Sequence, residues 1–375
     1  MNKLIFKFLP PSWKIKREFI SVYDGFIAFF LYIFSPLWMP IYNKKEMTSL
    51  QIYEGLKKYN SNLVIYLIHQ PRGLIESNII AIQFLVSKGY DVFVVSNGRL
   101  SNADIEKLQN ICWKIIIRKN IGYDFGGYRC GLRFLRQEKI LLNNLALIND
   151  SIWFPIIDDK TLLFDSSHKI TDFGGAVCLK NLNAKLEYLI LSYWIILQRH
   201  ILNSDKFWTF WDKYIPTSNK TLTVKLGERG LSSHMIKSGF KADGIFTNES
   251  FMFAIKSASN NELRLTLKYG SYTDLLFENE SLHLLNTFEN SDHWRNLCFD
   301  FIQNVVNRRG FLHSFCYASI SILNVPFLKK NNLELQKRMR QQYINAVLAN
   351  DLPKPPLPIW LEILKTSKRN NRRTI

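Results

Sequence analysis

A glycine-rich stretch, KNIGYDFGGYRCG at residues 119–131, holds one carboxylate, Asp124, among four glycines. The next apolar run, NLALINDS, ends in Asn149, Asp150 and Ser151. Glycines at the start of a helix let the backbone approach a bulky anionic ligand, because no Cβ intervenes. A carboxylate at a strand end, flanked by an amide and a hydroxyl, suits a divalent cation that bridges phosphate oxygens. The two stretches therefore predict a site for a phosphorylated ligand.

Each carboxylate also has a purely structural explanation. Asp124 fits the N-cap position of the helix that follows, and Asp150 fits an ordinary turn at a strand end. The glycine spacing matches neither the dinucleotide-binding motif GxGxxG nor the P-loop of nucleoside triphosphatases. The sequence thus argues against those two ligand classes and leaves both explanations of each aspartate open.

Strands and helices alternate along the chain from residue 62. Apolar, β-branched runs predict strands at residues 62–70, 91–98, 113–119 and 144–150. Apolar spacing and capping residues predict helices at 75–88, at 101–110 and, after the glycines, at 128–137. Because the strands are continuous apolar runs, we expect a parallel sheet covered by helices on both faces. The predicted fold class is α/β: a Rossmann-like, mostly parallel sheet with helical additions at both ends of the chain.

The carboxyl ends of parallel strands are where such sheets bind ligands. Polar residues stand at these positions: His69 after the first strand, Ser96 and Asn97 after the second, and Asp150 after the fourth. The glycine turn follows the third strand. Although every strand must end in something polar, the coincidence indicates a ligand site at this edge of the sheet.

The composition is that of a folded and strongly basic protein. The chain has 375 residues, 47% of them hydrophobic, which is enough for a substantial core and argues against disorder. Its five cysteines form no CxxC pair, which favours reduced thiols in a cytosolic protein over a disulfide framework or a zinc site. The net charge of +18 indicates an anionic partner, either a phosphorylated substrate or a membrane surface. No nucleic-acid-binding motif accompanies the charge, so we expect no nucleic-acid partner.

The N-terminal segment, residues 1–60, is basic at first and then apolar over GFIAFFLYIFSPLWMPIY (25–42). One interpretation is a buried first helix followed by a proline-rich turn at Pro36 and Pro40. The other is a helix that dips into a membrane leaflet, with each basic residue on a lipid headgroup contributing roughly 1 kcal/mol. A full span is least favoured, because the apolar run is at the short limit for one.

The remaining chain divides into three expected parts. The main α/β domain occupies residues 61–250, a mainly helical appendage follows at 251–350, and a proline-rich and then basic tail ends the chain at 351–375. Aromatic residues in 192–211 have helical spacing, which favours a core over a sugar-binding groove.

The motifs, taken in order, resemble those of nucleotide-diphospho-sugar glycosyltransferases of the GT-A fold. KNIGYDFGGYRCG and LALINDSIWFP are more closely similar to the rhamnan synthesis protein F family, bacterial enzymes of polysaccharide and lipopolysaccharide assembly. The resemblance continues through ITDFGGAV (170–177), residues 192–211 and KLGERGLSSHMIKSGF (225–240). It spans about residues 60–245.

This resemblance implies roles for the residues at the strand ends. Asn149, Asp150 and Ser151 stand where GT-A enzymes carry a metal-binding motif with two carboxylates, and only one carboxylate is present here. The resemblance therefore implies either Mg²⁺ or Mn²⁺ bound at Asp150, with water completing the shell, or a donor bound without metal. The remaining implied donor-binding residues are His69, Ser96, Asn97, Asn120, Gly122, Asp124, Gly126 and Gly127.

Two acidic residues are implied to be catalytic. Glu228 matches the acidic position of a late helix in inverting GT-A enzymes, where a carboxylate deprotonates the acceptor hydroxyl; an alcohol is a poor nucleophile without such a base. The alternative is that Glu228 stands in the first turn of a helix, where the dipole favours it. Asp172, in TDFGG, matches a segment that faces the donor sugar or the acceptor. His234 is a further, weaker candidate.

The resemblance thus implies an inverting glycosyltransferase that moves a sugar, by family L-rhamnose from a deoxythymidine-diphosphate donor, onto a growing polysaccharide or lipopolysaccharide glycan. The alternative is a non-catalytic scaffold of the same fold that binds nucleotide or glycan. The acceptor would be lipid-linked or polysaccharide, and we expect a cytoplasmic protein that is peripheral at the inner face of the bacterial cytoplasmic membrane.

Overall fold

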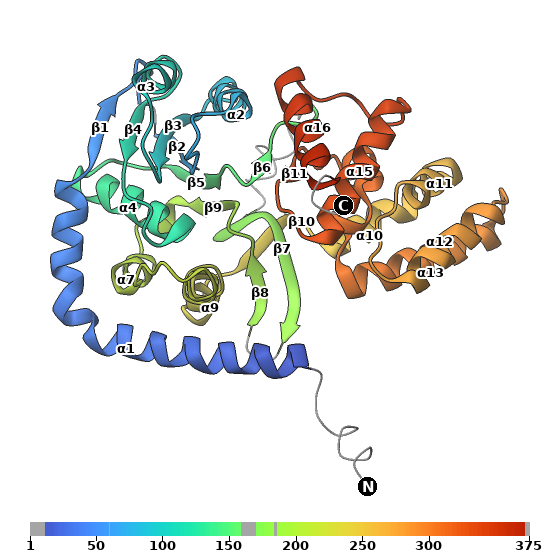
Figure 1. Ribbon diagram of the computed structural model, residues 1–375, viewed down its shortest axis with the longest axis horizontal. Coiled ribbons are helices and arrows are strands. Elements are labelled where there is room, and N and C mark those ends of the chain that lie inside the picture. Colours follow the sequence, from blue (N-terminus) through green and yellow to red (C-terminus); the bar gives the residue numbers. More distant parts are fainter. Residues whose placement is uncertain (1–11, 60, 159–169, 184–185, 372–375) are drawn as a thin grey trace, which may run out of the picture.

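The computed structural model describes residues 12–59, 61–158, 170–183 and 186–371. Within these residues a nine-stranded sheet forms the centre of the molecule, in the order β1-β4-β3-β2-β5-β9-β7-β10, with β8 paired to β7 (Figure 1). Its strands are β1 (Gln51–Glu54), β2 (Asn62–Ile68), β3 (Asp91–Ser96), β4 (Lys114–Ile117), β5 (Asn144–Asn149), β7 (Phe173–Asn183), β8 (Leu186–Ile190), β9 (Trp194–Gln198) and β10 (Ala242–Phe246). A second, two-stranded sheet joins β6 (Ile152–Trp153) to β11 (Leu328–Lys329).

Helices cover both faces of the large sheet (Figure 1). Those within or before the sheet-forming part are α1 (Ser12–Thr48), α2 (Glu76–Ser87), α3 (Asn102–Gln109), α4 (Tyr123–Gln137), α6 (Arg199–Leu202), α7 (Asp205–Lys213), α8 (Lys220–Thr223), the π-helical turn η3 (Val224–Glu228) and α9 (Arg229–Lys237). Those that follow are α10 (Asn248–Ser257), α11 (Asn260–Lys268), α12 (Leu275–Asn286), α13 (Asp292–Arg309), α14 (Phe311–Ser314), η4 (Ala318–Ile322), α15 (Glu334–Leu348) and α16 (Leu357–Asn371).

The four predicted strands are β2, β3, β4 and β5, and they pair in parallel in the order β4-β3-β2-β5. Alternate residues of β2 face opposite layers: Val64 and Tyr66 join the core cluster that includes α2, whereas Ile65 and Leu67 join the one that includes α4. Burial on both faces explains why these strands read as continuous apolar runs. The predicted α/β, Rossmann-like fold class is confirmed.

The helix after the glycines begins earlier than its residue pattern predicts. It starts at Tyr123, after Gly122, whose φ of 84° is a left-handed conformation that glycine adopts without strain. Gly126 and Gly127 consequently lie inside α4. A Cβ on Gly127 would lie 2.2 Å from Leu67 Cδ1, and one on Gly126 would lie 2.0 Å from Ile121 O. Gly127 therefore lets α4 pack directly on β2, and Gly126 lets the first turn of α4 pack on the carbonyl group of Ile121. The ligand-approach role expected for these glycines stays a prediction.

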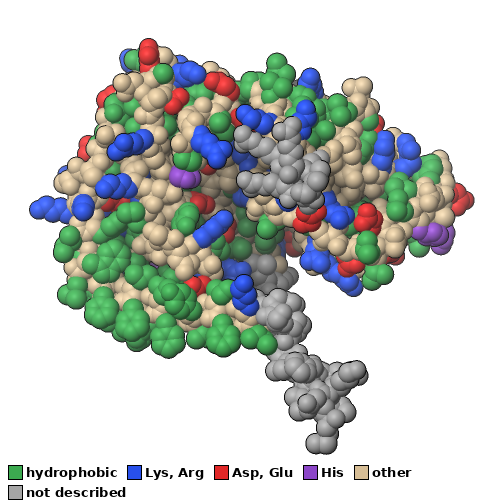
Figure 2. All heavy atoms as spheres, in the orientation of Figure 1, with side chains coloured by type: hydrophobic (Ala, Val, Ile, Leu, Met, Phe, Trp, Pro, Cys, Tyr) green, Lys and Arg blue, Asp and Glu red, His purple; other side chains and the backbone are tan. Residues whose placement is uncertain are grey.

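Helix α1 is one continuous helix through Pro36 and Pro40, so the predicted proline-rich turn is wrong. Figure 1 shows that the helix bends, and prolines inside a helix are the usual cause. The side of α1 that faces the protein carries buried polar groups. One of them, Asp24, accepts a hydrogen bond from Asn219 Nδ2 (2.9 Å). Its outer side is apolar, as Figure 2 shows along the lower edge of the molecule. The exposed residues there are Phe19, Ile20, Val22, Tyr23, Phe26, Phe29, Phe30, Tyr32, Ile33, Phe34, Leu37 and Ile41.

The exposed apolar side contradicts the expectation of a buried first helix. Among the described residues, one helix is long and apolar enough to cross a membrane, over Glu18–Thr48, and 6% of its apolar window is buried. A helix whose polar side faces the protein and whose apolar side faces outward has the reverse pattern of a soluble surface helix. Placement in a membrane stays a prediction.

The chain from α10 to α16 is mainly helical, and Figure 1 shows it beside the β7–β10 end of the sheet. This part is tied to the α/β part by β11, which pairs antiparallel with β6, and by α16, which contacts α2. The division of the chain into four parts stays a prediction. The pairing of β11 nevertheless brings residues near 329 to the end of β5, and this has consequences for the site.

Candidate functional site

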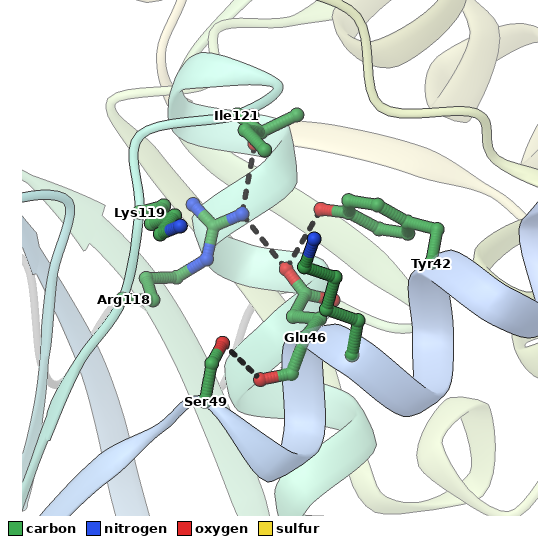
Figure 3. A pocket seen from close by; sticks show the side chains of 7 residues that line it. Tyr42, Glu46, Ser49, Arg118, Lys119 and Ile121 are labelled. Atoms are coloured by element: carbon green, nitrogen blue, oxygen red, sulfur yellow. Dashed lines mark hydrogen bonds and ion pairs between the residues drawn. The ribbon is translucent and has the colours of Figure 1, made fainter.

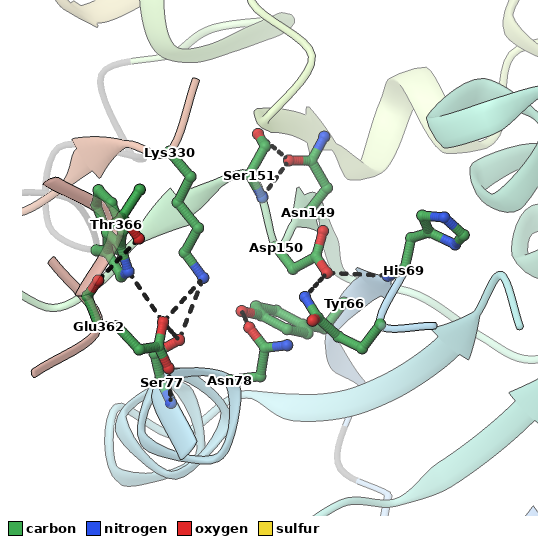
Figure 4. A network of polar contacts seen from close by, with 12 residues as sticks. Tyr66, His69, Ser77, Asn78, Asn149, Asp150, Ser151, Lys330, Glu362 and Thr366 are labelled. Carbon is green, nitrogen blue, oxygen red and sulfur yellow. Dashed lines mark hydrogen bonds and ion pairs between the residues drawn. The ribbon is translucent and has the colours of Figure 1, made fainter. Parts of the chain in front are cut away.

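Asp150 follows β5 and lies at the carboxyl edge of the parallel strands. Its Oδ2 accepts hydrogen bonds from the N–H of His69 (2.9 Å) and from Gln70 Nε2 (2.5 Å) (Figure 4). Its own N–H donates to Leu67 O (3.0 Å). Burial raises the pKa of this carboxyl group, while these donors and the ammonium group of Lys330 oppose the shift. The carboxylate is therefore held in a fixed position between the ends of β2 and β5.

The ring of His69 connects the ends of β2 and β3, since Nδ1 lies 2.9 Å from Asn97 O. The amide of Asn97 is already bonded within the protein: Nδ2 donates to Tyr123 O (2.9 Å), and Oδ1 accepts from Arg118. Arg118 in turn donates to Glu46 Oε1 of α1 (2.8 Å), beside a cavity of about 230 Å³ (Figure 3). A chain of contacts thus runs from the exposed His69 to the end of α1, and the Asn97 side chain connects elements within it.

The structure brings together the two stretches in which the sequence places a ligand site. Asn149 Nδ2 donates to Asp124 Oδ2 (3.2 Å), and Asn149 Oδ1 accepts from the N–H (3.1 Å) and the hydroxyl of Ser151. The N-cap of α4 is Gly122, so the N-cap interpretation of Asp124 is wrong. Asp124 stands in the first turn of α4, where the helix dipole favours a carboxylate. Its side chain points to the end of β5.

Glu228 lies at the same edge of the sheet, next to the start of β9. Its Oε1 accepts a hydrogen bond from the N–H of Ser192 (2.7 Å), and Ser192 O accepts one from Tyr128 OH on α4 (2.9 Å). Glu228 ends the π-helical turn η3 within a continuous helical run, Lys220–Lys237, so it does not stand in the first turn of a helix. Such π-helical turns occur frequently at functional sites.

Lys329, from far along the chain, lies near Asp124 and Glu228 and carries the opposite charge. Lys329 lies on β11, which pairs with the strand that follows Ser151. Its Nζ donates to Ser151 Oγ (3.2 Å) and lies 3.8 Å from the centre of the Tyr193 ring. Burial lowers the pKa of Lys329 to about 8, while the charges of Glu228 and Asp124 oppose that shift.

Lys330, the next residue, holds β11 in place. Its backbone N–H donates to Ser151 O (2.8 Å), and its Nζ donates to Ser77 Oγ (3.1 Å) and lies 3.9 Å from Glu362 Oε2 (Figure 4). The same Glu362 accepts a hydrogen bond from Trp153 Nε1 (3.0 Å). Contacts from α2 and α16 thus fix the segment that carries Lys329.

Asp172 lies at the amino ends of β5 and β7, whereas Asp150 lies at the carboxyl end of β5. Strands β5 and β7 both run antiparallel to β9, so they run in the same direction. Phe173 at the start of β7 pairs with Leu197, which also pairs with Leu145 at the start of β5. Asp172 is therefore level with Asn144 at the beginning of β5, about 20 Å along the strand from Asp150. The structure does not bring these two aspartates together.

Asp172 and His234 make local contacts away from Asp150. The carboxylate of Asp172 lies 3.1 Å from His200 Nε2 and accepts a hydrogen bond from the N–H of Lys241 (2.7 Å). His234 Nε2 lies 2.7 Å from Lys206 O. Each side chain thus connects neighbouring elements of the fold.

The remaining predicted donor-binding residues are divided between buried and accessible positions. Ser96 is buried, and its hydroxyl donates to Gly98 O (2.8 Å). Asn120 is exposed on the loop before α4, next to the turn at Gly122. Of these positions, Asn120 has the accessible side chain.

The donor groups around Asp150 do not fit a bound divalent cation. Within the described part of the chain, no group of three or more His, Cys, Asp or Glu side chains could hold a metal ion. One Asp150 oxygen already accepts two hydrogen bonds, and the charge of Lys330 acts on this carboxylate. Lys329 reaches the adjacent Ser151. Two ammonium groups would repel a metal ion here, so no chemical step is assigned to one.

The aromatic residues of the 192–211 region form core as predicted, although Trp194 begins strand β9 and Tyr193 directly precedes it, so neither lies in a helix. Five of the six are buried: Tyr193, Trp194, Phe207, Phe210 and Trp211. Tyr193 also belongs to the site, because its ring contacts the Lys329 ammonium group and its hydroxyl has no hydrogen-bond partner among the described residues.

No sequence pattern indicates Lys329, Lys330 or Tyr193 as site residues. VPFLKK ends in two lysines, but nothing local connects this pair to a strand more than a hundred residues earlier. Gln70 was visible as the polar neighbour of His69 at a strand end. Its amide could be recognised as a partner of Asp150 only from the pairing of β2 with β5.

Comparison with known proteins adds a family to this geometry. The model of the family described as rhamnan synthesis protein F matches residues 92–263, which include the glycine turn, Asp150 and Glu228. The chain is also 30% identical, over 293 residues, to the uncharacterized protein y4gN of Sinorhizobium fredii; that alignment covers 77% of this chain and 76% of that protein. Lys329 lies outside the residues that the family model matches.

Proposed function

The chain belongs to the rhamnan synthesis protein F family, which implies a glycosyltransferase-type enzyme of polysaccharide synthesis, and from this premise we propose an inverting glycosyltransferase of the GT-A type. It transfers a sugar from a nucleotide-diphosphate donor to a growing cell-surface polysaccharide or lipopolysaccharide glycan. The donor sugar in this proposal is L-rhamnose, carried on deoxythymidine diphosphate. Support for that sugar comes from the family's description.

The observation that carries the proposal is the convergence of Asp124, Asp150 and Glu228 at one edge of the sheet. Asn149 bonds Asp124 directly, and its N–H donates to Tyr193 O (3.3 Å), next to the Ser192 N–H that Glu228 binds. Ligands of parallel α/β sheets bind at this edge, beyond the carboxyl ends of the strands. The order β4-β3-β2-β5 with an antiparallel β9 supports the proposal, because the resemblance implies a nucleotide-sugar at the carboxyl ends of such strands.

Glu228 is the proposed general base. One of its oxygens is held by Ser192, which fixes the direction of the carboxylate. The carboxylate takes the proton of the acceptor hydroxyl while that oxygen attacks the sugar C1 from the side opposite the diphosphate. The bond between C1 and the phosphate oxygen breaks, the nucleoside diphosphate leaves with the electron pair, and the configuration at C1 inverts.

The exposed apolar side of α1 supports a place at a membrane surface. Buried Asp24 and Glu46 hold the inner side of α1 on the protein, so the aromatic outer side is free to enter the interfacial layer of a bilayer. Between α1 and the helix at residues 220–229 lies a cavity of about 580 Å³ whose lining includes Lys220, Lys225 and Arg229. These cations suit anionic headgroups, and we propose a peripheral protein at the inner face of the cytoplasmic membrane.

The proposal is tested by measuring sugar transfer and nucleotide binding on the same Glu228→Gln protein. A catalytic base predicts that transfer is lost while binding of deoxythymidine diphosphate is retained. If the variant supports unchanged glycan synthesis in cells, the chain acts instead as a non-catalytic scaffold that binds nucleotide or glycan.

A further inference from the structure

Lys329 is a partly buried cation that contacts no counter-ion among the described residues. Its neighbour Lys330 pairs with Glu362 and donates to Ser77, whereas Lys329 forms no ion pair with any described residue. Among the described residues, its ammonium group donates one hydrogen bond, to Ser151 Oγ. An ammonium group carries three donors, so two remain for another acceptor.

Burying such a charge is unfavourable unless something compensates for it. The Tyr193 ring face, 3.8 Å away, supplies a cation–π contact, and Glu228 and Asp124 attract the ammonium group from a longer distance. These contributions keep the pKa of Lys329 at about 8, so the group is charged at neutral pH. Lys329 therefore keeps its charge and has donors available at the carboxyl edge of the sheet, where ligands bind. Such a group is suited to bind an anion.

We propose that Lys329 binds the diphosphate of the nucleotide-sugar donor and takes the place that a divalent cation has in metal-dependent enzymes. This inference rests on the proposed function. The position agrees with it, because Ser151 closes the NDS motif at which the donor diphosphate is expected.

In the transfer step, the acceptor hydroxyl forms the new bond to C1 and gives its proton to Glu228. The bond between C1 and the diphosphate oxygen breaks, and the electron pair stays on the leaving nucleoside diphosphate. The fixed charge of Lys329 stabilises this developing negative charge and requires no reorganisation during the reaction. No other reactant is needed for the step to balance.

Lys329 also explains why the helical part of the chain belongs to the enzyme. The strand β11 that presents it comes after α10–α14 and η4, and α16 fixes the following residue through Glu362. The donor site is therefore incomplete without residues outside the stretch that the family model matches.

The test is calorimetric titration of the full chain with deoxythymidine diphosphate and uridine diphosphate, in EDTA and again in Mn²⁺. The proteins are the wild type, Lys329→Met, Lys329→Arg and Lys354→Met, the last being a change at an exposed lysine. We expect the wild type to bind equally in EDTA and Mn²⁺, and Lys329→Met to bind about tenfold or more weakly, because a charge-assisted hydrogen bond is lost. Lys329→Arg should recover part of the affinity, and Lys354→Met should match the wild type.

Circular dichroism and the thermal midpoint of each variant establish that it is folded; if Lys329→Met does not fold, the comparison is made with Lys329→Arg and Lys329→Gln. Binding by the wild type only in Mn²⁺ would overturn the role of Lys329 and leave the glycosyltransferase proposal intact. Unchanged affinity in a folded Lys329→Met protein would also overturn the role of Lys329 and leave the glycosyltransferase proposal intact. A wild type that binds neither nucleotide in either buffer would overturn the donor site and this inference together.

Discussion

Lys329 Nζ lies 3.2 Å from Ser151 Oγ, although 178 positions separate the two residues in the chain. The contact joins the helical part of the protein to the end of the central strand β5. It also brings a charged group next to Asn149-Asp150-Ser151, where the resemblance implies the donor diphosphate. The proposed site therefore draws on both halves of the chain.

Nucleotide binding is expected to weaken as the pH rises through about 8. The pKa of Lys329 in the free protein is lowered to about 8, first by burial. Glu228 and Asp124 raise it, Lys220 lowers it, and His313 nearby is neutral because burial lowers its pKa to about 4. A bound diphosphate stabilises the protonated amine, so affinity is full below about pH 8 and falls above it.

The measurement for this pH dependence is the dissociation constant of deoxythymidine diphosphate between about pH 6.5 and pH 9.5. Lys329→Arg supplies the control, since its guanidinium stays protonated over this range and its affinity should not fall. A wild-type affinity that is constant across pH 8 would contradict the assignment.

Replacing Glu228 by Gln is expected to lower the rate of sugar transfer by about 10²–10⁴-fold, the range typical of a general base. The amide is similar in size and cannot take a proton from the acceptor hydroxyl. Glu228 contacts Ser192, and its charge also raises the pKa of Lys329. Nucleotide affinity should therefore stay within about twofold when it is measured near pH 6, where Lys329 is protonated in both proteins. Glu106→Gln, at an exposed position on α3, is the matched control. A transfer rate that stays near the wild-type value would remove Glu228 from the mechanism.

The strands and the carboxyl-edge site could be predicted because parallel strands buried on both faces leave long apolar runs in the sequence. The start of α4 does not follow from the residue pattern, because Gly126 and Gly127 have low helix propensity. Their presence is explained by close packing, of Gly127 on β2 and of Gly126 on the turn at Ile121. Lys329 could not be found, since a two-residue strand leaves no pattern. Asp172 was grouped with the site because a motif does not reveal in which direction β7 runs, and the register shows the opposite edge.

The buried ion pair between Glu46 and Arg118 is expected to contribute strongly to stability. Their side chains are 6% and 2% exposed, and Arg118 Nη2 lies 2.8 Å from Glu46 Oε1. Glu46→Gln removes one charge and leaves a buried guanidinium uncompensated, which costs about 3–5 kcal/mol of unfolding free energy. Denaturant titration measures the loss. Glu54→Gln, which changes a carboxylate that is 70% exposed in its pair with Lys114, should cost at most about 1 kcal/mol. Equal losses in both variants would contradict the argument.

A methyl group at position 126 is expected to destabilise the fold. The Cβ of Gly126→Ala would lie 2.0 Å from the backbone carbonyl oxygen of Ile121, and backbone cannot move aside as a side-chain end can. Overpacking of about 1–3 kcal/mol should exceed the gain of roughly 1 kcal/mol from the better helix former. Gly98→Ala, which meets no atom within 4 Å, is the control in thermal unfolding. A Gly126→Ala protein as stable as the wild type would show that α4 can shift away from its turn.

Negative charges introduced by substitution on the outer side of α1 are expected to abolish binding of the protein to anionic vesicles. Phe26 and Phe30 are 62% and 53% exposed, so the double change Phe26→Glu with Phe30→Glu removes no core contact and should leave the thermal midpoint unchanged. In flotation with phosphatidylglycerol vesicles, the wild type should rise with the lipid and this variant should stay in the dense fraction, because glutamates resist burial at the interface and repel anionic headgroups. The paired control, Leu275→Glu with Leu276→Glu, alters equally exposed residues on α12 and should still float. If the wild type does not float, and sedimentation instead shows a dimer that the α1 variant loses, the apolar side is covered by a second copy of the chain.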